Sequence, residues 1–296
     1  PAGAPPGPLR PTPRHAGHGH EDEEEPAPPP PAADAASAGA GDAHEHGSTR
    51  ERNDSRRLDL YVAWTPLDRL TLTLDLPWAM NAIEEGESGD RTHYSLSGFG
   101  DVALAVNGVV WRNRPVLPST WLELRAWGKA PTGRDERRTD GVLDSHVQAG
   151  TGSWDWGVGA AAVHRFAWGS LYGSVFHRRN AEGGLDYEYG DVVLATAALE
   201  VPLGHALGVR ALQRVTPGMG FDFRWAGRDR AGGDGVADTG GSVLYASPSL
   251  RIALPAFGET HRAWLRTGVQ VPLTDAWLYD EQDEGVVWSV GVGYGF

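Results

Sequence analysis

The sequence of 296 residues contains no cysteine, only two methionines and no long apolar run. The absence of cysteine excludes a disulfide-stapled fold and any thiol chemistry. A membrane-spanning helix needs a run of about 18 apolar residues, and this sequence has none. Strands of a membrane barrel alternate between apolar and polar residues, so the mean hydropathy of −0.38 leaves that architecture open.

Basic residues are also fewer than acidic ones, 26 against 39, which gives a formal net charge of −13 at pH 7. Binding to nucleic acid phosphates requires clustered Lys and Arg side chains. The charge balance therefore argues against nucleic acid as a partner.

The first fifty residues contain almost no large apolar side chains. Up to Gly47, Leu9 is the single large apolar residue among Pro, Ala, Gly and acidic residues. Such a composition cannot bury enough surface to offset the entropy of the chain. Residues 1–50 are therefore predicted to form a disordered tail, which precedes a domain over residues 51–296.

Histidines are concentrated in this tail. "RHAGHGHEDEEE" places three of them beside acidic residues and "HEH" adds two more, so the candidate metal ligands are His15, His18, His20, His44 and His46. Imidazole and carboxylate groups suit Zn²⁺, Cu²⁺ or Ni²⁺, and a flexible chain can wrap around such an ion. The alternative is a solvated linker whose histidines bind ions only adventitiously.

From Arg57 onward, apolar residues recur at every second position. In "RLTLTLDLPWAM", four leucines and Trp78 alternate with Thr71, Thr73 and Asp75. This period predicts strands and no amphipathic helix between them. Eleven strands are readable, near 57–64, 69–80, 99–111, 119–130, 153–165, 169–178, 189–201, 205–216, 242–254, 261–271 and 285–296.

Short and long connections alternate along the chain. The long ones are rich in Gly and acidic residues and span roughly 81–98, 131–152, 179–188, 217–241 and 272–284. Outer-membrane barrels have this layout, whereas soluble sandwiches use Greek-key crossings. The predicted fold class is all-β: an antiparallel transmembrane meander β-barrel of about 12 strands. The alternative is a soluble β-sandwich or a lipocalin-like barrel.

The less apolar faces of the strands carry many charges, which a dry core could not bury unpaired but a wet lumen could. The predicted lumen-lining residues are Arg57, Asp59, Asp75, Asp101, Glu123, Arg125, Lys129, Arg165, Arg210, Arg214, Arg251, Arg262 and Arg266. Nine of these are basic, and six acids face them when Asp155 and Glu200 are added, so a mildly cationic lumen is expected. Six tryptophans are expected to form interfacial girdles at the strand ends, namely Trp64, Trp78, Trp121, Trp168, Trp264 and Trp288.

The two ends of the domain raise separate expectations. The chain ends in "VVWSVGVGYGF", where Val and aromatic residues alternate with Gly and Ser, and Phe296 resembles the signal read by the outer-membrane barrel insertion machinery. Bacterial single-chain barrels have an even number of strands, so a twelfth strand is predicted within residues 35–54. The first residue is Pro1, which fits either removal of a signal peptide or trimming of the chain.

Three stretches resemble one family of Gram-negative outer-membrane proteins. They are "WTPLDRLTLTLDLPW" at 64–78, "GFGDVALAV" at 98–106, and "APTG" at 130–133 followed by "GTGSWDWGVGAAAVHRF" at 150–166. The family is the outer-membrane β-barrel transporter family named for phenol meta-pathway degradation. Over residues 57–296, the resemblance implies a barrel of about a dozen strands that takes up small, often aromatic, compounds. The tail that is rich in His and acidic residues departs from the family pattern.

The sequence therefore predicts a passive channel for small aromatic or metal-related solutes in the outer membrane of a Gram-negative bacterium, and not an enzyme. Its expected partners are outer-membrane lipid, the insertion machinery and a periplasmic or lumenal protein. One alternative is a plugged barrel that serves as a scaffold and carries a metal-binding tail. Another is an outer-membrane lipid hydrolase.

Overall fold

The structure is a computed structural model that describes residues 52–85, 92–135, 148–237, 239–254, 262–278 and 284–295. The chain divides into two compact units, Pro1–Ala35 and Ala36–Phe296, and all the described residues belong to the second. The predicted tail over residues 1–50, its five candidate metal ligands and Phe296 lie outside the described residues.

One antiparallel sheet of twelve strands contains most of the described residues, and its strands follow one another in chain order. Its strands are β1 (Arg52–Leu67), β2 (Leu70–Glu85), β3 (Thr92–Phe99), β4 (Ala103–Arg112), β5 (Thr120–Lys129), β6 (Asp155–Arg165), β7 (Ser170–Arg179), β9 (Val192–Glu200), β10 (Val215–Ala226), β13 (Gly241–Leu254), β14 (Arg262–Leu278) and β15 (Val287–Gly295). β3 and β4 pair with different halves of β2, so they form one line that is interrupted at 100–102. The all-β antiparallel meander predicted from the sequence is confirmed.

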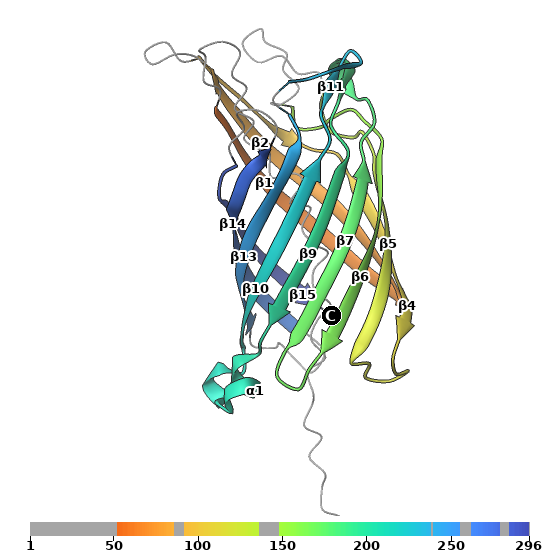
Figure 1. Ribbon diagram of the computed structural model, residues 1–296. Coiled ribbons are helices and arrows are strands. Elements are labelled where there is room, and N and C mark those ends of the chain that lie inside the picture. Colours follow the sequence, from red (N-terminus) through yellow and green to blue (C-terminus); the bar gives the residue numbers. More distant parts are fainter. Residues whose placement is uncertain are drawn as a thin grey trace, which may run out of the picture. The chain divides into compact units, whose positions relative to one another are not determined.

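The sheet curves into a barrel-like shape whose two ends differ (Figure 1). The turn end carries the connections 68–69, 113–119 and 166–169 and the short helix α1 (Leu203–Leu207). The loop end carries the longer connections, including a small second sheet of β8 (Tyr187–Glu188), β11 (Arg230–Ala231) and β12 (Asp234–Gly235). This division matches the alternation of short and long connections in the sequence.

The first and last strands of the sheet, β1 and β15, run in the same direction because ten successive antiparallel pairings link them. Within the described part of the chain, no hydrogen-bonded pairing joins β1 to β15. The sheet is therefore curved but not closed by backbone hydrogen bonds. A twelfth strand was predicted within residues 35–54. Residues 35–51 of that range lie outside the described residues, and residues 52–54 are the first residues of β1.

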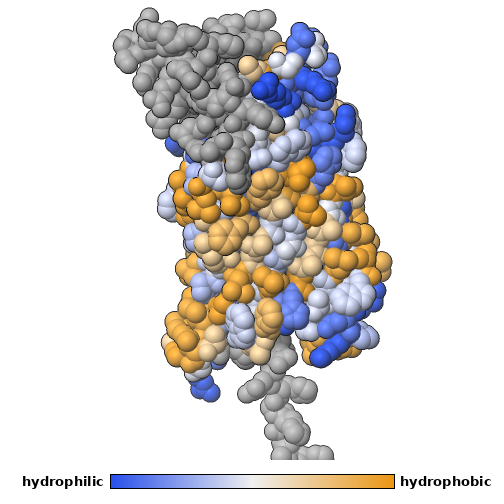
Figure 2. Space-filling view, viewed as in Figure 1, coloured by the Kyte–Doolittle hydropathy of each residue, from blue (hydrophilic) through white to orange (hydrophobic). Residues whose placement is uncertain are grey.

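The outer face of the curved sheet is apolar and exposed. In β6, Trp156 and Val158 are exposed on the outer face, whereas Asp155, Gly157 and Val163 are buried on the inner face. Figure 2 shows a broad apolar band over the middle of the visible surface and hydrophilic residues toward the loop end. The two-residue period of the sequence thus separates an apolar outer surface from a more polar inner one.

The structure corrects the sequence prediction between 201 and 226. The strand predicted at 205–216 is instead α1, a 3-10 helix (Arg210–Leu212) and a turn, and residues 217–226, predicted as a loop, belong to β10. Arg210 and Arg214 are therefore exposed in the connection at the turn end, and the prediction that they line the lumen from a strand is wrong. The signal for β10 was present, because Met219, Phe221, Phe223 and Trp225 alternate on one face.

Of the helices in the described residues, none has the length and apolar character to cross a membrane.

The predicted tryptophan girdle is correct only in part. Trp64, Trp168 and Trp288 are exposed on the outside of the sheet or at its turns. Trp121 is instead buried on the inner face, and the ring of Trp264 covers Gly293 from the same side. The two-residue period agrees with this outcome, because Trp121 lies two residues from Glu123 and Trp264 two residues from Arg266, and both charged residues were predicted to face the lumen.

The small sheet at the loop end is held by one buried carboxylate. Asp229 accepts hydrogen bonds from the Tyr187 hydroxyl (2.6 Å) and from the Gly190 backbone N–H (2.6 Å). Its own backbone N–H donates to Thr239 Oγ1 (3.0 Å). The loop between β7 and β9 is thereby joined to the loop between β10 and β13.

Asp229→Ala should loosen these two loops without unfolding the sheet. The change leaves two buried donors without their acceptor, which costs roughly 1–3 kcal/mol for each donor. Hydrogen exchange should accelerate at the amide of Gly190 and stay unchanged in β6. Asp234→Ala, at an exposed position of the same small sheet, is the matched control. Unchanged exchange at Gly190 would contradict this role of Asp229.

Candidate functional site

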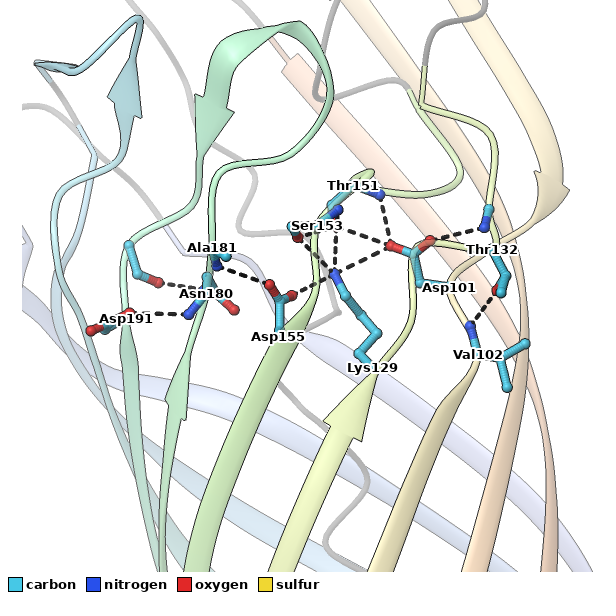
Figure 3. Close-up of polar contacts among 12 residues, drawn as sticks. Asp101, Val102, Lys129, Thr132, Thr151, Ser153, Asp155, Asn180, Ala181 and Asp191 are labelled. Carbon is cyan, nitrogen blue, oxygen red and sulfur yellow. Dashed lines mark hydrogen bonds and ion pairs between the residues drawn. The ribbon is translucent and has the colours of Figure 1, made fainter.

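Five side chains form a buried polar cluster on the inner face at the loop end, which we name the rim cluster: Asp101, Lys129, Thr151, Ser153 and Asp155 (Figure 3). The Lys129 ammonium lies between the two carboxylates, 3.2 Å from Asp101 Oδ2 and 2.5 Å from Asp155 Oδ2. It also donates to Thr151 Oγ1 and to Ser153 Oγ (3.3 Å). Lys129 is 12% exposed and both Asp side chains are 4% exposed, so this is a buried charge triad.

The local sequence places each member of the rim cluster at the end of a strand. Asp101 lies in the interruption between β3 and β4, Lys129 is the last residue of β5, and Asp155 is the first residue of β6. The inner-face row Asp75, Ala103, Lys129 and Asp155 is continuous across β2, β4, β5 and β6. Adjacent strand ends therefore bring the three charges together.

Asp101 fixes the backbone of the two loop segments that meet above it. Its carboxylate accepts from the N–H groups of Gly133 (2.9 Å) and Thr151 (2.8 Å). A Cβ on Gly133 would lie 2.7 Å from the Cα of Gly150, so this close crossing requires glycine. The motifs "GFGD", "KAPTG" and "GTGSWD" thus meet at a single point.

Lys129 is the only lysine in the sequence, against 25 arginines among the 26 basic residues. A compact ammonium with three donors fits between two carboxylates and two hydroxyls, whereas a planar guanidinium would not. The single lysine was a feature of the sequence that could have pointed to this site, but the two-residue period does not distinguish it from the other basic residues.

The polar network continues from the rim cluster to the next loop. The second oxygen of Asp155 accepts from the backbone N–H of Ala181 (3.0 Å). Asn180 donates its backbone N–H to Asp191 (3.0 Å) and its side-chain amide to the Gly190 carbonyl (2.6 Å). The start of the loop between β7 and β9 is therefore tied to the strand ends at the rim (Figure 3).

A second group of charges lies on β1 and β2. Arg57 pairs with Asp59 on its own strand, and its Nη2 lies 3.0 Å from Asp75 Oδ2 on the neighbouring strand. The structure therefore brings together three of the charges that the sequence assigned to the lumen. Asp75 is also in the same row as Lys129.

A third group is at the turn end. Glu200, the last residue of β9, lies 3.1 Å from Arg251 on β13 and 3.7 Å from Arg266 on β14. β10 and β13 separate β9 from β14, so the Glu200–Arg266 contact spans two intervening strands. Side chains can meet over that separation only on the concave side of a curved sheet, which identifies the inner face.

Two further arginines from the predicted set lie over aromatic rings. Arg125 lies above Phe176 at 5.4 Å from the ring centroid, and Arg165 lies above Trp121 at 4.6 Å. Trp121 in turn donates its indole N–H to Glu123 (2.7 Å). Such cation–π contacts help to hold the guanidinium planes in place.

Sequence reasoning missed the inner-face residues of β10, because that strand was taken for a loop. Asp222 accepts from Thr196 (2.6 Å), Ser247 and Gln270 (3.0 Å), which come from three other strands. Arg224 pairs with Glu284 (2.7 Å). Both positions alternate with the outward aromatic residues of β10, which is the pattern that could have identified them.

The remaining expectations concern Arg262 and chemistry at the surface. The side chain of Arg262 is outside the described set, although its backbone begins β14.

Within the described ranges, no group of three or more His, Asp or Glu residues could hold a metal ion. One hydroxyl–imidazole pair, Thr120 Oγ1 with His164 Nδ1 at 2.8 Å, lies on the outer-face positions of β5 and β6. No described carboxylate forms a hydrogen bond or ion pair with that histidine, so this pair gives the hydrolase alternative no support.

No protein-family model matches the sequence, and no curated protein does. Among solved structures, the chain is similar to an outer membrane channel from Pseudomonas putida F1, with a TM-score of 0.55. The two proteins are 15% identical, and the match covers 86% of this chain and 87% of the channel. At that identity the likeness shows a shared fold alone, which agrees with the architecture that the sequence predicts.

Proposed function

We propose that the chain is an outer-membrane channel of a Gram-negative bacterium that passes small polar solutes passively. The observation that carries this proposal is the contrast between the two faces of one curved sheet. Side chains such as Val158, Val175 and Leu124 form an exposed apolar outer face, while ion pairs occupy the concave face. A soluble protein would cover the apolar face with a second layer, whereas membrane lipid covers it directly.

The shared fold with an outer membrane channel supports the same proposal. In a channel, the polar side chains and water of the lumen replace the hydration of the solute during passage. The aromatic compounds implied by the family resemblance remain one candidate class of solute. The inner face carries the aromatic residues Trp121, Trp127 and Phe176, of which the two tryptophans are buried, and Trp127 and Phe176 meet edge to face at 6.2 Å.

The charge of the inner face is nearly balanced once the structure is used to assign it. The nine basic residues are Arg57, Arg112, Arg125, Lys129, Arg165, Arg178, Arg224, Arg251 and Arg266. The eight acidic residues are Asp59, Asp75, Asp101, Glu123, Asp155, Glu200, Asp222 and Glu284. Relative to the sequence prediction, Arg210, Arg214 and Arg262 drop out. Arg112, Arg178, Arg224, Asp222 and Glu284 enter.

The purified protein should form conducting pores in planar bilayers with a mild preference for anions. The preference follows from the excess of one basic residue on the inner face, nine against eight. The reversal potential in a salt gradient measures it. Absence of any conductance from protein that is folded in liposomes would favour the plugged-barrel alternative, and a clear cation preference would contradict the assignment of the inner face.

A further inference from the structure

The connections at the turn end expose large apolar side chains. Val116, between β4 and β5, is 76% exposed, and Leu207, the last residue of α1, is 63% exposed. The other exposed apolar residues of these connections are Leu117, Phe166, Trp168 and Val209. α1 projects beyond the end of β10 in Figure 1, and the apolar surface in Figure 2 continues to the same lower edge. The apolar outer face therefore extends past the ends of the strands.

Aromatic rings gather at the same border. Phe166 and Trp168 stack in the connection between β6 and β7, with ring centroids 5.2 Å apart, and both rings are exposed. Trp64 and Trp111 are exposed on the outer face near the turn ends of β1 and β4. Amphipathic aromatic side chains are enriched where the lipid of a membrane meets water. The turn end thus has the residue types of a membrane interface.

These connections also carry an excess of positive charge. Their exposed arginines are Arg69, Arg114, Arg210 and Arg214. Asp68 is the one acid in the described connections at this end, so the sum is 4 − 1 = +3. No ion pair joins these four arginines to an acid in the described part of the chain, and Glu200, on the inner face, is contacted by two other arginines. The connection 255–261 is outside the described residues, and its one acid, Glu259, leaves the sum positive.

The connections at the loop end have the opposite charge. The described residues of 180–191 and 227–240 include six acidic and two basic side chains, a sum of 2 − 6 = −4. Two exposed arginines at that end have acidic partners, because Arg230 lies 3.7 Å from Glu188 and Arg179 lies 3.6 Å from Asp191. A surface of anionic headgroups attracts basic residues within a screening length and repels acidic ones. Charge therefore favours contact between the turn end and such a surface.

We propose that the turn end forms an interfacial collar that binds the anionic headgroups of phospholipids. The collar consists of the four exposed arginines together with the exposed apolar residues of the same connections. Guanidinium groups match the oxygen atoms of a phosphate in pairs, and arginine stems extend along apolar surface toward a headgroup. The collar continues the lipid-facing outer surface and determines which end of the barrel lies in a phospholipid leaflet. It rests on the membrane location in the proposed function and not on conductance.

The position of the collar is tested with single cysteines, because the sequence contains none. Val116→Cys and Leu207→Cys are labelled with an environment-sensitive fluorophore and folded into vesicles of phosphatidylcholine and phosphatidylglycerol. Emission at both positions should shift to the blue, resist quenching by iodide and be quenched by brominated lipid. Asp234→Cys, at an exposed position of the loop end, is the matched control and should remain open to iodide. Water-like emission with full iodide quenching at both turn-end positions, as expected if a soluble protein were the partner, would overturn the collar.

The headgroup preference is tested with spin-labelled lipids that associate with the folded barrel in vesicles. Phosphatidylglycerol should be preferred over phosphatidylcholine by about fivefold at low salt, since one basic residue near an anionic surface contributes about that factor. The preference should weaken at high salt, where the charges are screened. R114Q/R210Q/R214Q should lose most of the preference.

The matched control is R134Q/R179Q/R230Q, which removes the same charge from exposed positions at the loop end and should retain the preference. Folding of every variant is checked by the heat-dependent shift in electrophoretic mobility that is typical of membrane barrels. Equal lipid selectivity in the wild type and both triple variants would overturn headgroup binding by the collar, and conductance in planar bilayers would then leave the channel standing. A preference that depends on the collar arginines, without conductance, would support the collar and overturn the channel. Failure of the wild type to insert into any of these vesicles would overturn both.

Discussion

Val290→Arg should prevent most of the protein from folding into a bilayer, whereas Gly291→Arg, one residue further on, should be tolerated. Both residues lie in the middle of β15, but their side-chain directions are opposite. Val290 is 77% exposed on the outer face, next to the equally exposed Trp288 and Val292. A Cβ added at Gly291 on the other face would meet no atom within 4 Å.

The expected difference follows from the solvent on each side. An arginine on the lipid face near the middle of a membrane strand costs about 2–4 kcal/mol, which is a large part of the stability of a domain. An arginine on the inner face at Gly291 keeps its water. It lies directly opposite Arg266, but repulsion between such a pair is roughly 0.2–1 kcal/mol and therefore smaller than the cost on the lipid face. The yield of folded protein in liposomes, read from the heat-dependent shift in mobility, measures the difference. Equal yields for the two variants would sink the assignment of the outer face to lipid, and with it the membrane location.

The two-residue period predicted most of the architecture because burial in a sheet alternates with the same period. Ten of the eleven readable strands coincide with described strands, and the exception at 205–216 has an understandable cause. Residues 201–214 contain alternating apolar residues within a compact connection, where α1 and a 3-10 helix pack at the turn end. Pro217, Gly218 and Gly220 then disguised the beginning of β10, although its outward aromatic residues continue the pattern.

The rim cluster could not be assembled from the sequence in the same way. Its members come from the ends of β5 and β6 and from two segments outside the strands, so their proximity depends on sheet register and on the loop path. The motifs that contain Asp101, Gly133 and Thr151 were visible, but nothing in their spacing indicated that one carboxylate accepts both backbone N–H groups. The sequence indicated many of the charged residues of the inner face, although not those of β10, and it left their partners open.

The order and direction of the strands bear on how the sheet could close into a barrel. β1 and β15 run in the same direction, and each has one edge without a pairing partner in the described part of the chain. Unpaired backbone groups are costly in hydrocarbon, and bacterial barrels close with antiparallel strands of even number. The twelfth strand within 35–54 remains a prediction from the sequence. If it forms, the His-rich tail continues from the loop end of β1 to the opposite side of the membrane.

Lys129→Met should destabilise the barrel strongly, by about 3–5 kcal/mol, because it removes one partner from a buried charge triad. Asp101 and Asp155 would then lie near each other at 4% side-chain exposure without a cation between them. Methionine fills a similar volume, so the loss of the ammonium and its four contacts is the main change. The same substitution releases Thr151 and Ser153, which belong to the loop that returns to β6.

Two controls separate the charge from the shape. Adding Asp155→Asn to Lys129→Met removes one of the two stranded carboxylates and should restore part of the stability, while Arg134→Met alters an exposed residue of the same loop and should have little effect. The midpoint of thermal unfolding is measured for every variant, and trypsin cleavage after Arg134 is measured for the variants that retain this arginine. Both should change for Lys129→Met and recover in the double variant. Because Lys129 is the only lysine, an amine-reactive reagent adds a direct test: apart from the terminal amine, the native protein should react slowly, and Asp101→Asn should increase the rate. Fast labelling of Lys129 in the native protein, or wild-type stability of Lys129→Met, would show that the rim cluster does not hold the loop end together.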